Sequence, residues 1–154
     1  MKVSEIMTEA AIHDRADDTL AEAARTMWDQ QTGSLLVMDG DDLQGIVTER
    51  DVLRAVAEGL DVNDTRLSEV MTKDVLTIHP GASLREALAI MTDKWIRHLP
   101  VVERGRVVGI VSQRDLAGVL GSAMTEPEAL SQLVESTELA RSKRLKRIDR
   151  GAWD

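Results

Sequence analysis

The sequence predicts an α/β fold, of the α+β type, built from two copies of one small unit. Two observations support this prediction. The phrase GIVTERD at residues 45–51 returns as GIVSQRD at residues 109–115. Around both phrases, an apolar pattern of helical period and short β-rich runs alternate in the same order. A unit that cannot bury its apolar face alone is expected to pack against its copy.

The repeat extends well beyond the two phrases. A shift of 64 residues aligns positions 4–56 with positions 68–120 without a gap, and 16 of the 53 pairs are identical. The identities include most of SEIMT against SEVMT, near the start of each copy. Such a match indicates an internal duplication. We therefore predict repeat one at 2–58, a linker at 59–67, repeat two at 68–121 and a C-terminal tail at 122–154.

Each repeat is expected to run strand, helix, strand, strand, helix. The first helix of each copy should begin at a capping box, which is Thr19-x-x-Glu22 in copy one and Ser83-x-x-Glu86 in copy two. Apolar residues follow both boxes at helical spacing, so one face of each helix should contact a core.

Two β-rich runs follow each helix and predict a hairpin. LLVM and LQGIVT flank Asp-Gly at residues 39–40, and LPVV and RVVGIVS flank Arg-Gly at residues 104–105. The second strand of each hairpin runs directly into a helix. Gly59 and Gly121 are expected to end these two helices as glycine C-caps.

The composition limits the functions that the chain can have. It contains no cysteine, which excludes disulfides and thiolate chemistry, and its net charge of -8 argues against a general nucleic-acid binder. No apolar run reaches the roughly 18 residues of a membrane span, and the N-terminus lacks the apolar run of a signal peptide. We therefore expect a cytoplasmic protein with no membrane segment, and the charge disfavours a nucleic-acid partner. A DNA-associated regulator that uses the basic C-terminal tail is a third, weaker alternative.

The sequence also lacks the common catalytic motifs. It contains no G-x-x-x-x-G-K-[ST] loop, no H-E-x-x-H and no G-x-G-x-x-G after a strand. The three histidines, His13, His79 and His98, do not have the spacing of zinc ligands. The sequence therefore predicts a binding and regulatory protein rather than an enzyme, with no metal site and no required cofactor.

The letters T-E-R-D and S-Q-R-D have two interpretations that are compatible with each other. Thr48 with Asp51, and Ser112 with Asp115, have the spacing of a helix N-cap, which stabilises a helix by about 1 kcal/mol. A helix N-terminus also favours an anion such as phosphate, and a carboxylate there can accept hydrogen bonds from ribose hydroxyls. The two motifs therefore predict two nucleotide clamps.

The paired pattern resembles a tandem pair of CBS domains, the cystathionine β-synthase repeat that forms a Bateman module. The resemblance rests on MT near the start of each copy and on a hairpin that ends in G-h-h-[ST]-x-x-D, where h is apolar. It implies two pseudo-twofold-related repeats packed through their sheets, with two clefts between them. It also implies a homodimer and a bound adenosine-containing ligand, which is AMP, ADP, ATP, S-adenosylmethionine or NAD.

The resemblance also implies which residues bind the ligand. Thr48 and Asp51 would serve one cleft, and Ser112 and Asp115 the other. The further expected ligand-binding residues are Gly33, Ser34, Arg50, Thr77, Ile78, Arg97, His98, Pro100 and Arg114. Arg97 and His98 would hold phosphates in the first cleft, so the second should take a less charged adenosyl group or none.

Several of these residues have a second interpretation. Arg97 would otherwise pair with a surface acid, and His98 would be a half-buried histidine that is already satisfied. Arg50 and Arg114 are either phosphate contacts or exposed helix positions.

The tail at 122–154 carries its acids early and its bases late, which suits a helix macrodipole and predicts a helix with a basic end. Because no catalytic domain accompanies the pair, any output requires a regulated protein partner, whose identity stays open. The alternative function is a ligand-independent scaffold whose tail docks a partner. The helix faces at 20–28 and 84–95 are expected to supply the apolar surface of the homodimer.

Overall fold

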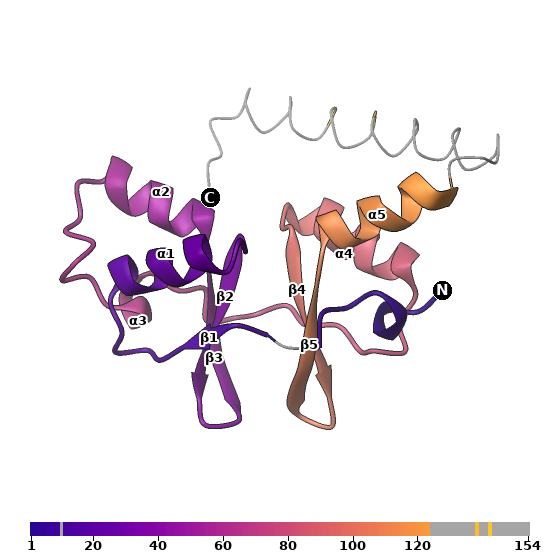
Figure 1. Cartoon of the computed structure of the whole chain (residues 1–154), viewed down its shortest axis with the longest axis horizontal. Coiled ribbons are helices and arrows are strands. Elements are labelled where there is room, and N and C mark those ends of the chain that lie inside the picture. Colours follow the sequence, from indigo (N-terminus) through magenta and orange to yellow (C-terminus); the bar gives the residue numbers. More distant parts are fainter. Residues whose placement is uncertain (10, 124–137, 139–141, 143–154) are drawn as a thin grey trace.

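The computed structural model describes residues 1–9, 11–123, 138 and 142. Figure 1 shows two lobes side by side, each with a β-hairpin near the middle of the molecule and helices around it. The first lobe contains β1 (His13–Asp14), α1 (Leu20–Asp29), β2 (Ser34–Asp39), β3 (Asp42–Thr48), α2 (Glu49–Ala57) and α3 (Leu67–Val70). The second lobe contains the 3-10 helix η1 (Val3–Glu5), α4 (Leu84–Lys94), β4 (His98–Glu103), β5 (Arg106–Ser112) and α5 (Gln113–Ala123). The predicted tail lies almost entirely outside the described residues.

Each lobe has its own small sheet and core. In the first sheet, β1 pairs with β2 in parallel and β2 pairs with β3 in antiparallel orientation; the second sheet is the antiparallel pair of β4 and β5. Leu35 opposes Val47, and Leu99 opposes Val111 at the equivalent register. All four side chains are fully buried, so the alternation of each hairpin directs one face into a core.

The predicted first strand of repeat two is reduced to a single bridge at Ile78. In the first lobe, the N–H of Leu36 donates a hydrogen bond to the carbonyl of Ile12, at 2.9 Å, beside β1. The aligned residue of the second lobe is Pro100, which has no N–H to donate. The expected ladder therefore cannot extend along this edge.

The helix and hairpin ends follow the sequence in most places. Thr19 and Ser83 cap α1 and α4, and Gly59 ends α2 with a φ of +74°. The turn of the first hairpin lies at Gly40 and Asp41, one residue later than predicted. The prediction for Gly121 is wrong, because α5 continues through this residue to Ala123 and Gly121 keeps a helical backbone.

The apolar stripes of α1 and α4 are used inside the lobes. Leu20, Ala23 and Met27 belong to the first core, and Ala87 and Met91 belong to the second. These side chains face the cores, whereas Trp28 of α1 is 77% exposed and leaves an apolar side chain for the predicted homodimer contact.

The N-terminal segment of repeat one packs on the second lobe. The side chain of Val3 is fully buried in the second core. The backbones of Thr8 and Ile110 exchange two hydrogen bonds of 2.9 Å. Repeat one therefore begins in the lobe that repeat two builds.

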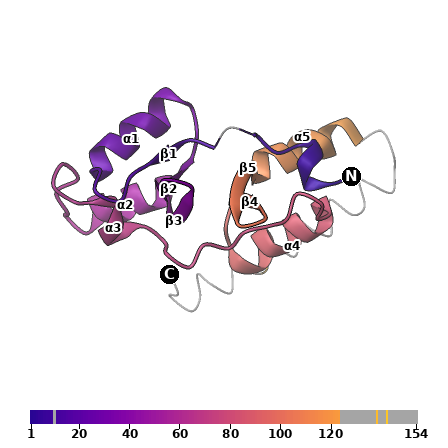
Figure 2. The same ribbon diagram turned by 90° about the horizontal axis from the view of Figure 1, so that it is seen from below.

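The corresponding segment of repeat two packs on the first lobe. Leu67, at the end of the predicted linker, is fully buried in the first core, and Thr72 exchanges two hydrogen bonds of 3.0 Å with Ile46. Figure 2 shows the two connections that pass between the lobes. The division at 2–58 and 68–121 describes the sequence repeat, whereas the packing units follow this exchange of segments.

The exchange explains the glycine of each GIV phrase. A Cβ added to Gly109 would lie 2.6 Å from the carbonyl oxygen of Thr8, and one added to Gly45 would lie 2.9 Å from the carbonyl oxygen of Thr72. Real Cβ atoms do not approach backbone oxygens so closely. Each crossing segment therefore requires a glycine in the strand beneath it.

We expect Gly109→Ala to lower the free energy of unfolding by about 1–3 kcal/mol, because the new methyl group overlaps the crossing backbone. Gly118→Ala is the matched control, since its Cβ meets nothing within 4 Å and alanine favours a helix. Urea unfolding of both variants measures the difference. Equal unfolding free energies for the two variants would contradict this account of the crossing.

Candidate ligand-binding clefts

Two clefts lie between the lobes, with volumes of about 720 Å³ and 220 Å³; we call them the large cleft and the small cleft. The lining of the large cleft includes Thr8, Ile12, Gly33, Ser34, Ile110, Ser112, Arg114 and Asp115. The lining of the small cleft includes Thr72, Leu76, Arg97, His98, Ile46, Thr48, Arg50 and Asp51. Each residue of the second set is 64 positions from its counterpart in the first. The clefts are therefore equivalent places in the duplicated unit.

The structure brings together most of the predicted site residues. The T-E-R-D motif shares the small cleft with Arg97 and His98, and the S-Q-R-D motif shares the large cleft with Gly33 and Ser34. Arg97 and His98 also line the large cleft, so they lie between the two sites.

Three predicted residues line neither cleft. Ile78 and Pro100 are buried in the second lobe, and Thr77 precedes the bridge at Ile78. From this part of the chain, the residues that line the small cleft are instead Thr72, Asp74, Val75 and Leu76. These residues belong to the segment that crosses between the lobes, which carries them past the cleft before the chain enters the second core.

Sequence reasoning missed the contribution of the crossing segments. Thr8 and Thr72 line the two clefts, as do Ile12 and Leu76. The signal was present, because Met-Thr is repeated without change in both copies. Its meaning depends on the exchange of segments, which places each threonine over the hairpin of the opposite repeat.

Both motifs cap their helices as predicted. One carboxylate oxygen of Asp51 accepts hydrogen bonds from the N–H of Thr48, at 2.8 Å, and from its hydroxyl, at 3.2 Å. One carboxylate oxygen of Asp115 accepts hydrogen bonds from the N–H and the hydroxyl of Ser112, both at 2.7 Å. Capping therefore uses one oxygen of each carboxylate and leaves the other for a further partner.

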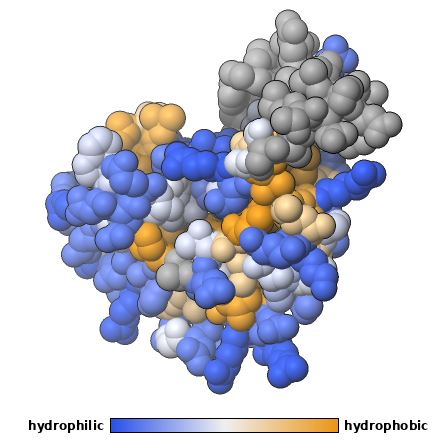
Figure 3. All heavy atoms as spheres, turned by 45° about the vertical axis from the view of Figure 1, so that its right-hand side comes forward, coloured by the Kyte–Doolittle hydropathy of each residue, from blue (hydrophilic) through white to orange (hydrophobic). Residues whose placement is uncertain are grey.

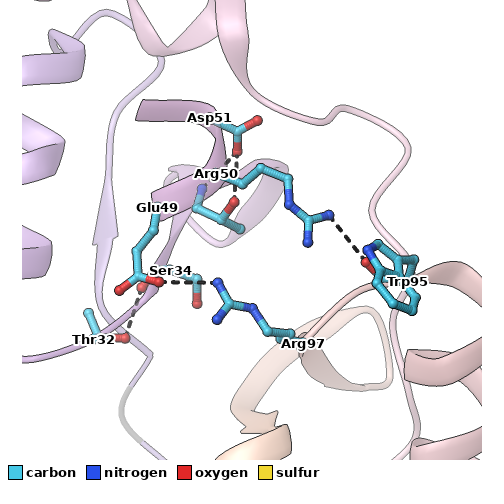
Figure 4. A network of polar contacts seen from close by, with 8 residues as sticks. Thr32, Ser34, Glu49, Arg50, Asp51, Trp95 and Arg97 are labelled. Carbon is cyan, nitrogen blue, oxygen red and sulfur yellow. Dashed lines mark hydrogen bonds and ion pairs between the residues drawn. The ribbon is translucent and has the colours of Figure 1, made fainter. Parts of the chain in front are cut away.

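The start of α2 contacts the segment before β4 across the clefts (Figure 4). The guanidinium of Arg97 forms an ion pair of 3.1 Å with Glu49, as the surface-acid interpretation expected. Arg50 donates a hydrogen bond of 3.3 Å to the carbonyl of Trp95, which has a left-handed φ of +58°. Two charged side chains of one repeat therefore tie it to the other.

The residue at position 33 limits the space around this ion pair. A Cβ added to Gly33 would lie 3.2 Å from the carboxylate of Glu49 and 3.3 Å from the ring of His98. The glycine allows both side chains to approach the wall of the large cleft.

Two polar groups of the large cleft are held in a low-polarity setting. Burial lowers the pKa of His98 below its ordinary value, and the neighbouring Arg97 lowers it further. The hydroxyl of Ser34 is buried and has no hydrogen-bond partner among the described residues. Because buried hydroxyls are usually paired, the unpaired oxygen is an unusual feature of this wall of the cleft.

The described residues contain no group of three histidines or acids that could hold a metal ion. Among the helices of the same residues, none is long and apolar enough to cross a membrane.

Comparison with known proteins gives the family of the chain. The model of the CBS domain matches twice, at residues 3–58 and 67–122, and the chain therefore belongs to the CBS domain family. The prediction of a tandem CBS pair is confirmed. The CBS domain-containing protein YhcV of Bacillus subtilis is 36% identical over 116 residues, which are 75% of this chain and 82% of that protein.

Two similar solved structures contain adenosine-derived ligands. The CBS domain pair of protein MJ0100 was determined in complex with 5′-methylthioadenosine and S-adenosyl-L-methionine. It is 28% identical with a TM-score of 0.74, and the match covers 80% of this chain and 98% of that one. The CBS domain protein PAE2072 from Pyrobaculum aerophilum, complexed with AMP, is 26% identical with a TM-score of 0.73 and coverages of 88% and 99%.

The lowered pKa of His98 has a measurable consequence. We expect its imidazole to titrate below 6.5 in NMR spectra, and Arg97→Ala to raise that pKa, because the variant removes a cation and leaves Glu49 unpaired. The neutral imidazole contributes stability above pH 6.5 that is lost as the pH falls through the folded pKa. A His98 pKa that Arg97→Ala leaves unchanged would contradict this account.

Proposed function

We propose that this protein is a regulatory module that binds an adenosine-containing ligand in the large cleft. The observation that supports this most directly is the capped start of α5, where capping uses one carboxylate oxygen of Asp115 and leaves the other for a ribose hydroxyl. The volume of about 720 Å³ lies within the usual range of small-molecule sites, and the small cleft, at about 220 Å³, lies below it. The adenosine-derived ligands of MJ0100 and PAE2072 support the same ligand class.

The charges of the large cleft favour a ligand with little net charge. Its lining contains two basic side chains, Arg97 and Arg114, and two acidic side chains, Glu49 and Asp115. The ion pair with Glu49 already occupies Arg97, so a triphosphate would have to displace a carboxylate. Among the candidates, 5′-methylthioadenosine, S-adenosylmethionine and AMP fit this balance better than ADP or ATP.

Regulation follows from the position of the cleft between the lobes. A ligand there contacts both repeats and can favour one arrangement of the lobes, by no more than its difference in affinity for the two arrangements. We propose that this change reaches a protein partner and that the chain itself catalyses no reaction. The proposal includes no required cofactor, no nucleic-acid partner and a cytoplasmic location.

Thermal unfolding with AMP, 5′-methylthioadenosine, S-adenosylmethionine and ATP tests the proposal. A ligand at 100 times its Kd should add about 2.7 kcal/mol, which corresponds to a shift of roughly 5 to 11 °C. We expect Asp115→Asn to lose the shift and Asp51→Asn, the matched control, to keep it. Nucleotide-free protein that shifts with no member of the panel would refute ligand binding, and loss in Asp51→Asn alone would move the site to the small cleft.

We also propose a homodimer formed through α2. Leu53 and Val56 lie one helical turn apart, and 70% and 61% of these residues are exposed. Most of the molecular face in Figure 3 is hydrophilic, and apolar side chains reach it only in patches. A second copy would bury such an apolar pair in a symmetric contact. The same pair favours the second candidate function, an assembly module that needs no ligand.

Analytical ultracentrifugation tests the dimer. We expect the wild-type chain to sediment as a dimer and the double variant Leu53→Glu/Val56→Glu to sediment as a monomer, because charges would be buried at the contact. Gln44→Glu, at an exposed position of β3, is the control and should stay dimeric. A wild-type protein that sediments as a monomer at all concentrations would refute the proposed dimer. A dimer whose unfolding temperature no ligand of the panel shifts would favour the assembly module.

A further inference from the structure

We propose that Arg54 makes the two clefts unequal, because it occupies the carboxylate that the small cleft would offer to a ribose. Its counterpart in the other repeat is Gly118, which leaves the carboxylate of the large cleft open. The inference rests on the proposed function and specifies which cleft binds the ligand and which residue decides it.

In the small cleft, both oxygens of Asp51 have partners. One accepts the two hydrogen bonds from Thr48, and the other accepts a hydrogen bond of 3.0 Å from the guanidinium of Arg54. Only 8% of Asp51 is exposed, so little of it can be reached around these partners. A ribose hydroxyl could donate a hydrogen bond to this second oxygen only after Arg54 had moved away.

In the large cleft, the equivalent carboxylate lacks such a cation. One oxygen of Asp115 accepts both donors of Ser112, and Asp115 takes part in none of the ion pairs among the described residues. Position 118, one helical turn further along α5, carries no side chain. The second oxygen therefore faces no competing guanidinium on its own helix.

The sizes and charges of the clefts agree with this difference. Arg54 lines the small cleft, whose volume is less than a third of that of the large cleft. Four basic residues line the small cleft (Arg50, Arg54, Lys94 and Arg97), against the two acids Asp51 and Asp74. Because this cationic excess surrounds a neutralised aspartate, the small cleft suits an anion better than it suits a ribose.

The duplication supplies a reciprocal experiment. Arg54→Ala removes the guanidinium from the small cleft, and Gly118→Arg adds one to the helix that opens the large cleft. The new side chain can be accommodated, because a Cβ at position 118 meets nothing within 4 Å. Ala117→Arg, at an exposed neighbouring position, adds the same charge on another face of α5 and is the control.

Isothermal titration calorimetry with 5′-methylthioadenosine is the measurement, because this ligand carries ribose hydroxyls but no phosphate. We expect one site per chain in the wild type, two in Arg54→Ala, and binding at least tenfold weaker in Gly118→Arg, with Ala117→Arg unchanged. In the double variant Arg54→Ala/Gly118→Arg, the single site should move to the small cleft and become sensitive to Asp51→Asn.

The outcomes separate this inference from the proposed function. If Arg54→Ala and Gly118→Arg each bind one 5′-methylthioadenosine per chain with wild-type affinity, the proposed role of Arg54 is overturned. The proposed ligand binding would then stand. Weaker binding of AMP in Arg54→Ala would identify Arg54 as a phosphate contact and would also overturn the inference. No binding of 5′-methylthioadenosine or AMP to any variant, all folded by circular dichroism, would overturn both proposals.

Discussion

The crossing of one short segment from each repeat to the opposite lobe is the constraint on which the rest of the structure depends. Val3 and Leu67 each fill the core of the lobe that the other repeat builds, so neither core is complete without the partner repeat. Backbone hydrogen bonds hold the segments against the central glycine-containing strands, and Gly45 and Gly109 provide the necessary space. The two repeats therefore form one folding unit although the sequence reads as two.

The clefts are a consequence of this crossing. Each crossing segment carries Met-Thr and then an apolar residue past the point where a hairpin strand becomes a helix, so one cleft forms at each crossing. The helix start supplies a capped aspartate, and the opposite repeat supplies the facing wall. A ligand in such a position would contact both repeats, so the proposed binding would be linked to the arrangement of the lobes.

The duplication produced equivalent clefts, and single substitutions made them different. Position 33 is glycine where position 97 is arginine, and position 54 is arginine where position 118 is glycine. The first difference allows Glu49 to meet Arg97 at the wall of the large cleft. The second decides whether the capping aspartate has a cationic neighbour. Small side-chain changes on a symmetric framework can therefore give one site for ligand and one that is occupied by the protein itself.

The sequence by itself determined what depends on neighbouring residues and on the repeat: the helix caps at Thr19 and Ser112, the two hairpins and the equivalence of the motifs. These features rest on contacts between residues three or four apart, or on a pattern that is written twice. Pro100 also carried a local signal, since its missing N–H accounts for the shortened sheet. Only the tertiary structure decided which lobe each crossing segment completes, which acid Arg97 meets and which residues line the clefts. These depend on contacts between residues far apart in the chain, and no local pattern encodes such distances.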